Sequence, residues 1–363
     1  MLIGLARLAL GDQHSILLKQ DGSLWSAGSN KYGQLGDGST MNKFSFVLAV
    51  WRSLIRDVKA VSAGSAHSLA LKQDDSVWAT GKNQYGQLGD GSRIDKNTFV
   101  LVMADGAQAV AAGREFSMVL KQDGSVWTAG CNNFGQLGDG SMADNPRFFR
   151  VIASGAKAVA AGEVHSIVLK EDGSVWTAGR NYNGQLGQGS RYDKNVFLKV
   201  ISSGTVAVVA GGYHSMALKD DGSVWATGCN EYGQLGDGST TDKTKYVKVV
   251  WTGAKAIASG SRHSMVLKKD GSVWGTGYNL YGQVGDGSTN NIQAYVQVIS
   301  GGAKDISAGA FHSMVLKEDG SIWATGSNEN GQFGDGSRTS STTFVRLAPT
   351  FGNGAGRLTT PSI

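Results

Sequence analysis

One stretch of sequence, repeated along the chain, carries the fold information. In one copy, residues 165–179 read HSIVLKEDGSVWTAG and residues 180–190 continue RNYNGQLGQGS. An apolar run, an Asp-Gly pair and a second apolar run predict a β-hairpin, with Gly173 at the turn position that needs a positive φ. The stretch therefore predicts antiparallel strand pairs and no helix.

The stretch recurs seven times, and each copy contains a tryptophan: Trp25, Trp78, Trp127, Trp176, Trp225, Trp274 and Trp323. The spacing between them is 53 residues once and 49 residues five times. Residues 157–162, upstream of one hairpin, predict a third strand, and segments such as 246–250 and 295–299 predict a fourth. Four short strands per repeat are typical of a propeller blade. We predict an all-β, seven-bladed β-propeller with four-stranded blades and with the tryptophans wedged between blades.

The two ends of the chain match complementary parts of the repeat. Residues 344–347 align with the fourth-strand segments, and residues 5–9 align with the third strand. We therefore expect the ring to close through N- and C-terminal strands that share one blade, which would leave no open sheet edge. The prediction is a single propeller domain over residues 1–350, followed by a flexible tail over residues 351–363.

The composition indicates a globular protein, with 40% hydrophobic and 17% charged residues in a chain of 363. No apolar stretch approaches the ~20 residues of a membrane span, and residues 1–10 do not resemble a signal peptide. Cys131 and Cys229 occupy equivalent positions in non-adjacent repeats, which argues against a disulfide between them. We expect no membrane association and a cytoplasmic or nuclear location, on condition that the chain is not a fragment.

The repeat resembles that of the regulator-of-chromosome-condensation family. The shared core is Ser-Val-Trp-x-x-Gly-x-Asn-x-x-Gly-Gln-Leu-Gly, which occurs in all seven repeats with few substitutions, over roughly residues 5–348. The resemblance implies a seven-bladed propeller but no single function. Members include a chromatin-bound exchange factor for the GTPase Ran, propeller modules of ubiquitin ligases and a plant ultraviolet-B receptor. That receptor would have a photosensing tryptophan where this chain has Ser261, so the resemblance does not imply ultraviolet sensing.

Residues that repeat in every blade are interpreted as framework. This applies to six histidines, each followed by serine: His14, His67, His165, His214, His263 and His312. Neighbours on a strand point to opposite faces, so His and the next Ser do not form a catalytic pair, and we expect each imidazole to bond a nearby backbone group. The Asp of each Gly-Asp-Gly-Ser is interpreted as a turn cap and not as a calcium ligand. No cofactor, metal site or catalytic residue is predicted.

The hairpin lysines and aspartates are interpreted in the same way. Each of seven lysines, such as Lys170, is followed two residues later by an aspartate, such as Asp172. The resulting ring of charge is nearly neutral. We therefore expect solvated turns there, and no phosphate-binding surface.

Residues that vary between blades are the candidates for function. The pair before each His-Ser and the residue after the glycine that follows tryptophan differ from blade to blade, and the pairs should emerge on one face of the disc. Arg and Tyr are frequent hot-spot residues at interfaces. The predicted partner-binding face comprises Arg114, Arg180, Tyr213, Arg262, Tyr278 and Phe311.

Three classes of function remain open at this point. The first is a non-enzymatic protein-interaction scaffold whose protein partner the sequence does not identify. The second is an exchange regulator of a Ran-like GTPase, although the one longer spacing, near residues 48–56, leaves no room for an inserted β-wedge. The third is an enzyme or ligand-binding ring with a site on the axis. The net charge of +5 permits weak contact with nucleic acid or chromatin, but no basic cluster interleaved with aromatic residues supports it.

Overall fold

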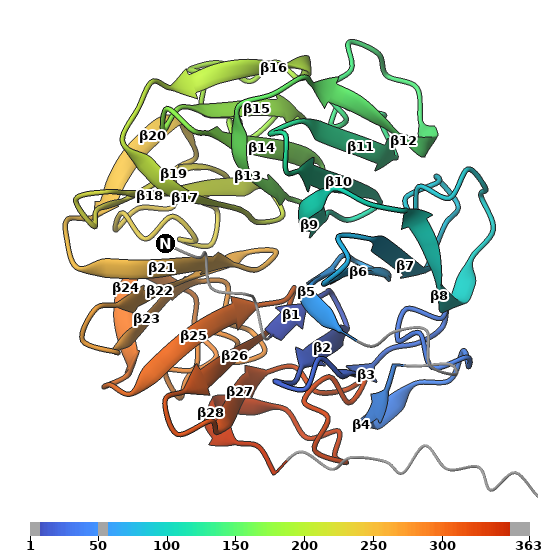
Figure 1. Cartoon of the computed structure of the whole chain (residues 1–363). Helices are drawn as coiled ribbons and strands as arrows, with labels where there is room; N and C mark the ends of the chain where they lie inside the picture. Colours follow the sequence, from blue (N-terminus) through green and yellow to red (C-terminus); the bar gives the residue numbers. More distant parts are fainter. Residues whose placement is uncertain (1–7, 50–56, 349–363) are drawn as a thin grey trace, which may run out of the picture.

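The computed structural model describes residues 8–49 and 57–348 and consists of seven four-stranded antiparallel sheets arranged as a ring (Figure 1). The predicted all-β, seven-bladed propeller is confirmed. Within the described ranges there is no helix, and so none that is long and apolar enough to cross a membrane. The predicted tail over residues 351–363 lies outside the described residues, as do residues 50–56 of the longer second spacing.

Each blade is built from four strands that follow one another in the chain. Blade by blade, the strands are β1 Leu8–Leu10, β2 His14–Leu18, β3 Leu24–Gly28, β4 Lys43–Leu48; β5 Val58–Ala63, β6 His67–Lys72, β7 Val77–Gly81, β8 Lys96–Met103; β9 Ala107–Ala112, β10 Phe116–Lys121, β11 Val126–Gly130, β12 Asn145–Ile152; β13 Ala156–Ala161, β14 His165–Lys170, β15 Val175–Gly179, β16 Lys194–Ile201; β17 Thr205–Ala210, β18 His214–Lys219, β19 Val224–Gly228, β20 Lys243–Val250; β21 Ala254–Ser259, β22 His263–Lys268, β23 Val273–Gly277, β24 Ile292–Ile299; and β25 Ala303–Ala308, β26 His312–Lys317, β27 Ile322–Gly326, β28 Ser341–Arg346.

The first strand of each blade lies nearest the axis and the fourth lies at the periphery (Figure 1). The hairpin between second and third strands follows the predicted pattern, since Val168 lies opposite Trp176 and Gly173 has φ 74°. Because successive strands run in opposite directions, the first and third connections of a blade emerge on the same face. We call this the loop face.

The prediction that the terminal strands share a blade is wrong. β1 pairs with β2 and β28 pairs with β27, so the two ends of the described chain belong to adjacent, separate blades. Short connections let each blade pair its own consecutive strands, and no strand exchange is needed. The joint is made by a loop that reaches the next blade: the Gly336 amide donates to the Phe44 carbonyl at 2.9 Å, as Gly287 does to Thr342 at 2.9 Å. The closing joint therefore uses the same contact as the joint before it.

Histidine–serine pairs fasten neighbouring blades to each other. His165 Nε2 lies 2.8 Å from Ser215 Oγ in the next blade, and His312 Nε2 lies 2.9 Å from Ser15 Oγ across the closing joint. The partner is thus a hydroxyl of the next blade and not the nearby backbone group expected from the sequence. Only in the third blade is the pair missing, because Phe116 stands where the other blades have histidine.

The tryptophans pack between blades, as predicted, but they remain partly exposed. Trp176 lies against the apolar cluster of the preceding blade, which includes Met118 and Leu120. Its indole nitrogen donates to Ser174 Oγ at 3.0 Å, and the Lys170 ammonium lies 4.5 Å from the ring centroid. In six of the seven blades the repeated lysine is therefore a partner of the tryptophan ring, and the interpretation as a solvated turn missed this cation–π contact.

Candidate partner-binding face

The varied residues of the loop face are held on a rigid backbone. Arg180 directly follows β15, and its amide donates to the Val164 carbonyl of the same blade at 2.9 Å. In the sixth blade, the Tyr278 amide donates to the Arg262 carbonyl at 2.8 Å. The end of each third strand is therefore tied to the first connection of its blade. A side chain placed there can reach the loops of both neighbouring blades.

Arg180 shows this three-blade arrangement. Its guanidinium carbon lies 4.7 Å from the centroid of Phe134 in the preceding blade and 5.8 Å from that of Tyr213 in the following blade. All three side chains are partly exposed. Burial and the carboxylate of Glu163 both raise the pKa of the Tyr213 phenol, so it stays protonated at neutral pH. We call these three residues the Arg180 clamp.

A larger cluster, which we call the aromatic patch, joins the fifth, sixth and seventh blades. It comprises Tyr232, Arg262, Tyr278, Tyr281 and Phe311. The Tyr278 ring lies 4.9 Å from Tyr232 and 6.4 Å from Phe311, and Tyr281 lies 5.2 Å from Phe311. Arg262 Nη1 donates to the Tyr232 hydroxyl at 2.9 Å, and its guanidinium stacks on the same ring. The structure thus brings together three residues predicted from the sequence, Arg262, Tyr278 and Phe311.

Arg114, the remaining predicted residue, lies apart from the aromatic patch at the mouth of the central channel. Its guanidinium pairs with Glu163 at 3.5 Å, and Glu163 also accepts from the Ser261 hydroxyl two blades away. Glu163 can reach that far because Gly212 lies between them, where a Cβ would approach Glu163 Oε1 to 2.7 Å. Burial raises the pKa of Asp12 at the same mouth to about 6, opposed by a hydrogen bond from Ser65. These polar groups satisfy one another.

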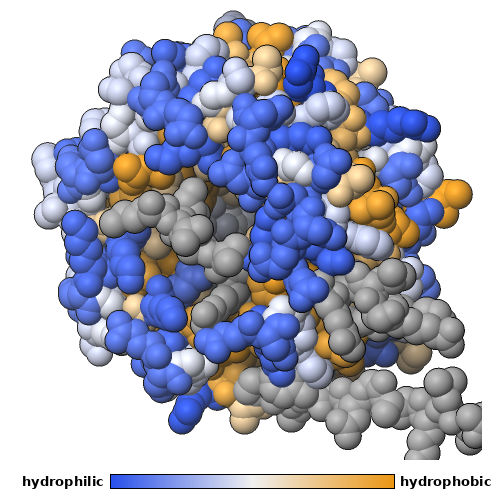
Figure 2. Space-filling view, in the orientation of Figure 1, coloured by the Kyte–Doolittle hydropathy of each residue, from blue (hydrophilic) through white to orange (hydrophobic). Residues whose placement is uncertain are grey.

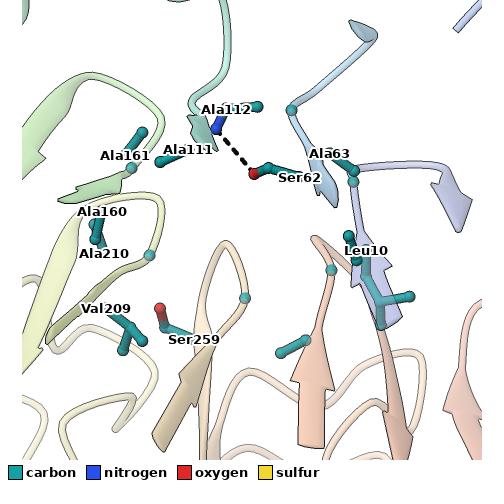
Figure 3. A pocket seen from close by; sticks show the side chains of 18 of the residues that line it. Leu10, Ser62, Ala63, Ala111, Ala112, Ala160, Ala161, Val209, Ala210 and Ser259 are labelled. Atoms are coloured by element: carbon teal, nitrogen blue, oxygen red, sulfur yellow. Dashed lines mark hydrogen bonds between the residues drawn. The ribbon is translucent and has the colours of Figure 1, made fainter. Parts of the chain in front are cut away.

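Small side chains line the channel beneath this mouth. Figure 3 shows Ala111, Ala160, Ala210 and their equivalents from successive inner strands, with one hydrogen bond from the Ala112 amide to Ser62 Oγ at 2.9 Å. Among the described residues, no group of three or more His, Cys, Asp or Glu side chains is placed to hold a metal ion. Polar side chains also line it, among them Ser62, Ser259, Asp305 and Ser307.

The buried histidine–serine pairs do not have the geometry of a nucleophile and its base. The Ser215 hydroxyl donates its single proton to the Gln185 carbonyl at 2.7 Å. His165 must therefore donate through Nε2, which leaves it unable to accept the serine proton. Both side chains are fully buried, and burial lowers the pKa of His165 to about 3. The pairs are framework, as the sequence indicated, although by a contact between blades.

The turn-capping role predicted for the repeated aspartates is confirmed. Asp237 Oδ1 accepts from the Ser239 amide at 3.0 Å and from Asn230 Nδ2 at 3.0 Å, and Lys243 lies 3.1 Å from Asp237 Oδ2. Part of the positive charge behind the net +5 is neutralised in this way. Lys243 is paired with Asp237, and Arg191 is paired with Asp242 of the next blade at 3.2 Å.

Sequence reasoning missed four residues of this face: Phe134, Glu163, Tyr232 and Tyr281. The aromatic ones occupy the position before Gly-Gln-Leu-Gly, which is aromatic in five of seven blades. A signal is present in the sequence, since an aromatic side chain in five of seven loops is more than a turn requires. Which blades supply its neighbours is visible only in the folded ring.

Comparison with known families settles what kind of propeller this is. A profile described as "RCC1-like domain" matches residues 101–357, which is more than half of the chain. The chain belongs to the RCC1-like domain family. Profiles of the regulator of chromosome condensation (RCC1) repeat also match residues 6–34, 58–87, 21–71 and 74–120.

Curated relatives share only short stretches with this RCC1-like chain. Human X-linked retinitis pigmentosa GTPase regulator is 37% identical over 95 residues, covering 26% of this chain and 9% of that protein. Human protein RCC2 is 42% identical over 83 residues, covering 23% and 16%. The Arabidopsis thaliana ultraviolet-B receptor UVR8 is 34% identical over 106 residues, covering 28% and 24%. The matched stretches thus span less than a quarter of each relative.

Solved structures support the fold of the RCC1-like ring. Prp20p from Saccharomyces cerevisiae, described with its binding to Gsp1p and histones, superimposes with a TM-score of 0.80 at 21% identity over 94% of this chain and 87% of that one. Human WBSCR16 gives a TM-score of 0.77 at 22% identity over 85% of each chain. At these identities the likeness concerns the fold alone.

Proposed function

We propose that this RCC1-like propeller is a non-enzymatic scaffold that binds a protein partner through its loop face. The observation that carries the proposal is the aromatic patch, in which partly exposed aromatic and arginine side chains from three blades lie in mutual contact. Aromatic and arginine anchors on a rigid support are typical of interface hot spots. Figure 2 shows one face of the ring, which is mostly hydrophilic with apolar residues in small separate groups.

The framework supports a binding function because it holds the varied residues in fixed positions before a partner binds. Three contacts recur in nearly every blade: the His–Ser pair, the bond from a loop glycine amide to a carbonyl of the next blade, and the loop built around Asn. The ring therefore stays the same whichever residues occupy the loop tips. A preorganised surface loses less entropy on binding than a flexible one. The aromatic patch therefore meets a partner nearly in its bound form.

The test is capture with a wild-type ring and with a ring carrying Tyr213→Ala and Arg262→Ala. We expect partners identified by mass spectrometry, and then rebound as purified proteins, to lose at least tenfold in affinity with the double variant. The melting temperature should stay within about 3 °C, because both side chains lie at the surface. A matched control is Arg338→Ala, since Arg338 stacks on Phe44 at 5.4 Å but lies outside the aromatic patch. Retained affinity in the double variant would reject this face.

Exchange activity toward a Ran-like GTPase is the alternative function. Its only support beyond the family is the fold likeness to Prp20p. The same preparation should leave the release of fluorescent GDP from a panel of small GTPases unchanged. Acceleration for any member would favour the alternative over the scaffold.

A further inference from the structure

Three arginines of the loop face, Arg180, Arg262 and Arg338, have no ionic partner among the described residues, although Arg338 donates to the Glu329 carbonyl at 2.7 Å. Arg114, Arg93 and Arg191 each pair with a carboxylate within 3.5 Å. Arg180 and Arg262 have aromatic partners instead, and both are partly exposed. A guanidinium keeps its charge at every relevant pH. Two permanent charges on the proposed interface are therefore left for a partner to neutralise.

Arg262 also retains donors for an incoming group. The bond to the Tyr232 hydroxyl uses Nη1, and the guanidinium carbon lies 5.1 Å from the centroid of that ring. A guanidinium has five N–H donors arranged to grip a carboxylate with two of them. The existing contacts hold the side chain in place, so less rotamer freedom is lost when the carboxylate binds.

Next to this charge lies a continuous apolar surface. The rings of Tyr278, Tyr281 and Phe311 meet at interplanar angles of 56–65° and centroid distances of 5.2–6.4 Å. Leu280, in the same loop, is 57% exposed. The rings pack against one another, and the Arg262 guanidinium carbon lies 5.1 Å from the centroid of Tyr232. The surface is suited to a large apolar side chain lying flat on it.

We propose that the aromatic patch and the Arg180 clamp bind an acidic protein segment. One carboxylate pairs with Arg262, an adjacent large apolar side chain lies on Tyr278, Tyr281 and Phe311, and a further carboxylate pairs with Arg180. This inference rests on the proposed function, because it names the chemistry of the partner that the loop face would bind. Charge complementarity selects the segment: a neutral or basic one would bury two unpaired guanidinium groups.

Nucleic acid fits this surface less well. Single-stranded RNA binds by stacking bases on open aromatic faces along a basic groove. Here the rings are packed edge to face, and rim cations such as Arg191 and Lys243 are neutralised by aspartates. The protein segment is therefore the occupant, and RNA is a competing outcome of the experiment.

The experiment uses the full chain and an array of ten-residue Gly/Ser peptides. Each peptide carries one Phe and one or two Asp residues at separations of one to four positions, with matched series in which Asn or Lys replaces Asp and Ser replaces Phe. The tightest peptide is then measured in solution by fluorescence anisotropy. We expect the Asp peptide to bind at least tenfold more tightly than its Asn counterpart, and both the Lys and the Ser series to show no binding.

Variants of the protein test whether the preference for Asp peptides depends on the aromatic patch and the Arg180 clamp. Arg262→Gln should weaken the best Asp peptide at least tenfold, and Arg180→Gln should weaken the two-Asp members more than the one-Asp members. Arg338→Gln, which removes a stacked arginine elsewhere on the ring, should change affinity less than twofold. Thermal melting of each variant confirms that it is folded.

Several results would overturn the inference. These are an array with no binding, equal affinity for Asp and Asn peptides, or full affinity in Arg262→Gln. A 20-nucleotide poly-uridine strand that binds more tightly than any peptide, and depends on Arg262, would show nucleic-acid recognition instead. If no peptide of the array binds, but a captured partner is lost in the Tyr213 and Arg262 variant, the acidic segment is rejected and the scaffold function is kept. If the array selects Asp peptides, but the captured partner binds the variant as tightly as the wild-type ring, the scaffold function of this face is rejected.

Discussion

Acidification from pH 7 to pH 5 is expected to remove most or all of the free energy of unfolding. Burial lowers the pKa of the ring histidines from 6.5 to about 4 for His14 and His214 and to about 3 for His67, His165, His263 and His312. Nδ1 of all six has no hydrogen-bond partner, so a proton there would be buried and unsatisfied. The folded ring therefore keeps its histidines neutral while the unfolded chain protonates them.

The direction in which stability changes with pH follows from this difference in pKa between the folded and unfolded chain. The folded pKa values are depressed, so the stability is fully present above pH 6.5 and is lost as the pH falls toward the folded values. Each histidine contributes a slope of ~1.4 kcal/mol per pH unit in that window, or ~8 kcal/mol for six. Asp12, with its pKa raised to about 6, acts in the opposite direction and offsets about one of them. A domain typically has only ~5–15 kcal/mol of stability.

The measurement is urea unfolding followed by circular dichroism between pH 7.5 and pH 5. The chain provides a matched control, because the third blade folds with Phe116 in the histidine position. His165→Phe should reduce the pH slope by about one proton and leave Ser215 donating to Gln185. Phe116→His, which faces Ser166, should increase the slope by about one. A stability that stays constant from pH 7 to pH 5 would contradict the buried neutral ring.

Asn230→Asp is expected to destabilise the ring by ~3–5 kcal/mol at pH 7. The Asn230 side chain is fully buried; its Oδ1 accepts from the Leu235 amide at 2.9 Å, and its Nδ2 donates to Asp237 at 3.0 Å and to the Ser239 carbonyl at 2.9 Å. The substitution removes the donors and places two carboxylates in contact. Each unsatisfied buried group costs ~1–3 kcal/mol, and a buried charge costs more.

Asn181→Asp is the matched control for this substitution. Asn181 makes the same loop contacts, with Leu186 and Ser190, but the fourth blade has Gln188 where the fifth has Asp237. It should be less destabilising by ~2 kcal/mol, which isolates the carboxylate repulsion. Asp237→Asn added to Asn230→Asp should recover about half of the loss. Equal costs at positions 181 and 230, measured by chemical denaturation, would show that the repulsion plays no part.

The sequence by itself determined the blade. Apolar runs, the Asp-Gly turn and the recurring tryptophan are local signals, and each one reports strand, turn or spacing within a single repeat. Repetition then multiplied one local prediction into seven, which is why the seven-bladed architecture and the framework role of His and Asp were predicted correctly, although the closure of the ring was not. The varied positions, including Arg180, Tyr278 and Phe311, were also visible, because they depart from an otherwise constant pattern.

Only the tertiary structure decided what lies between blades. Whether the ends share a sheet depends on pairing energies of strands far apart in the chain, and the closing joint proved to be a loop contact from Gly336 to Phe44. The His–Ser bonds join residues about fifty positions apart, and Arg262 meets Tyr232 only because adjacent blades place them together. A repeat specifies its own strands through local periodicity. Contacts between repeats depend on ring geometry, which periodicity does not encode.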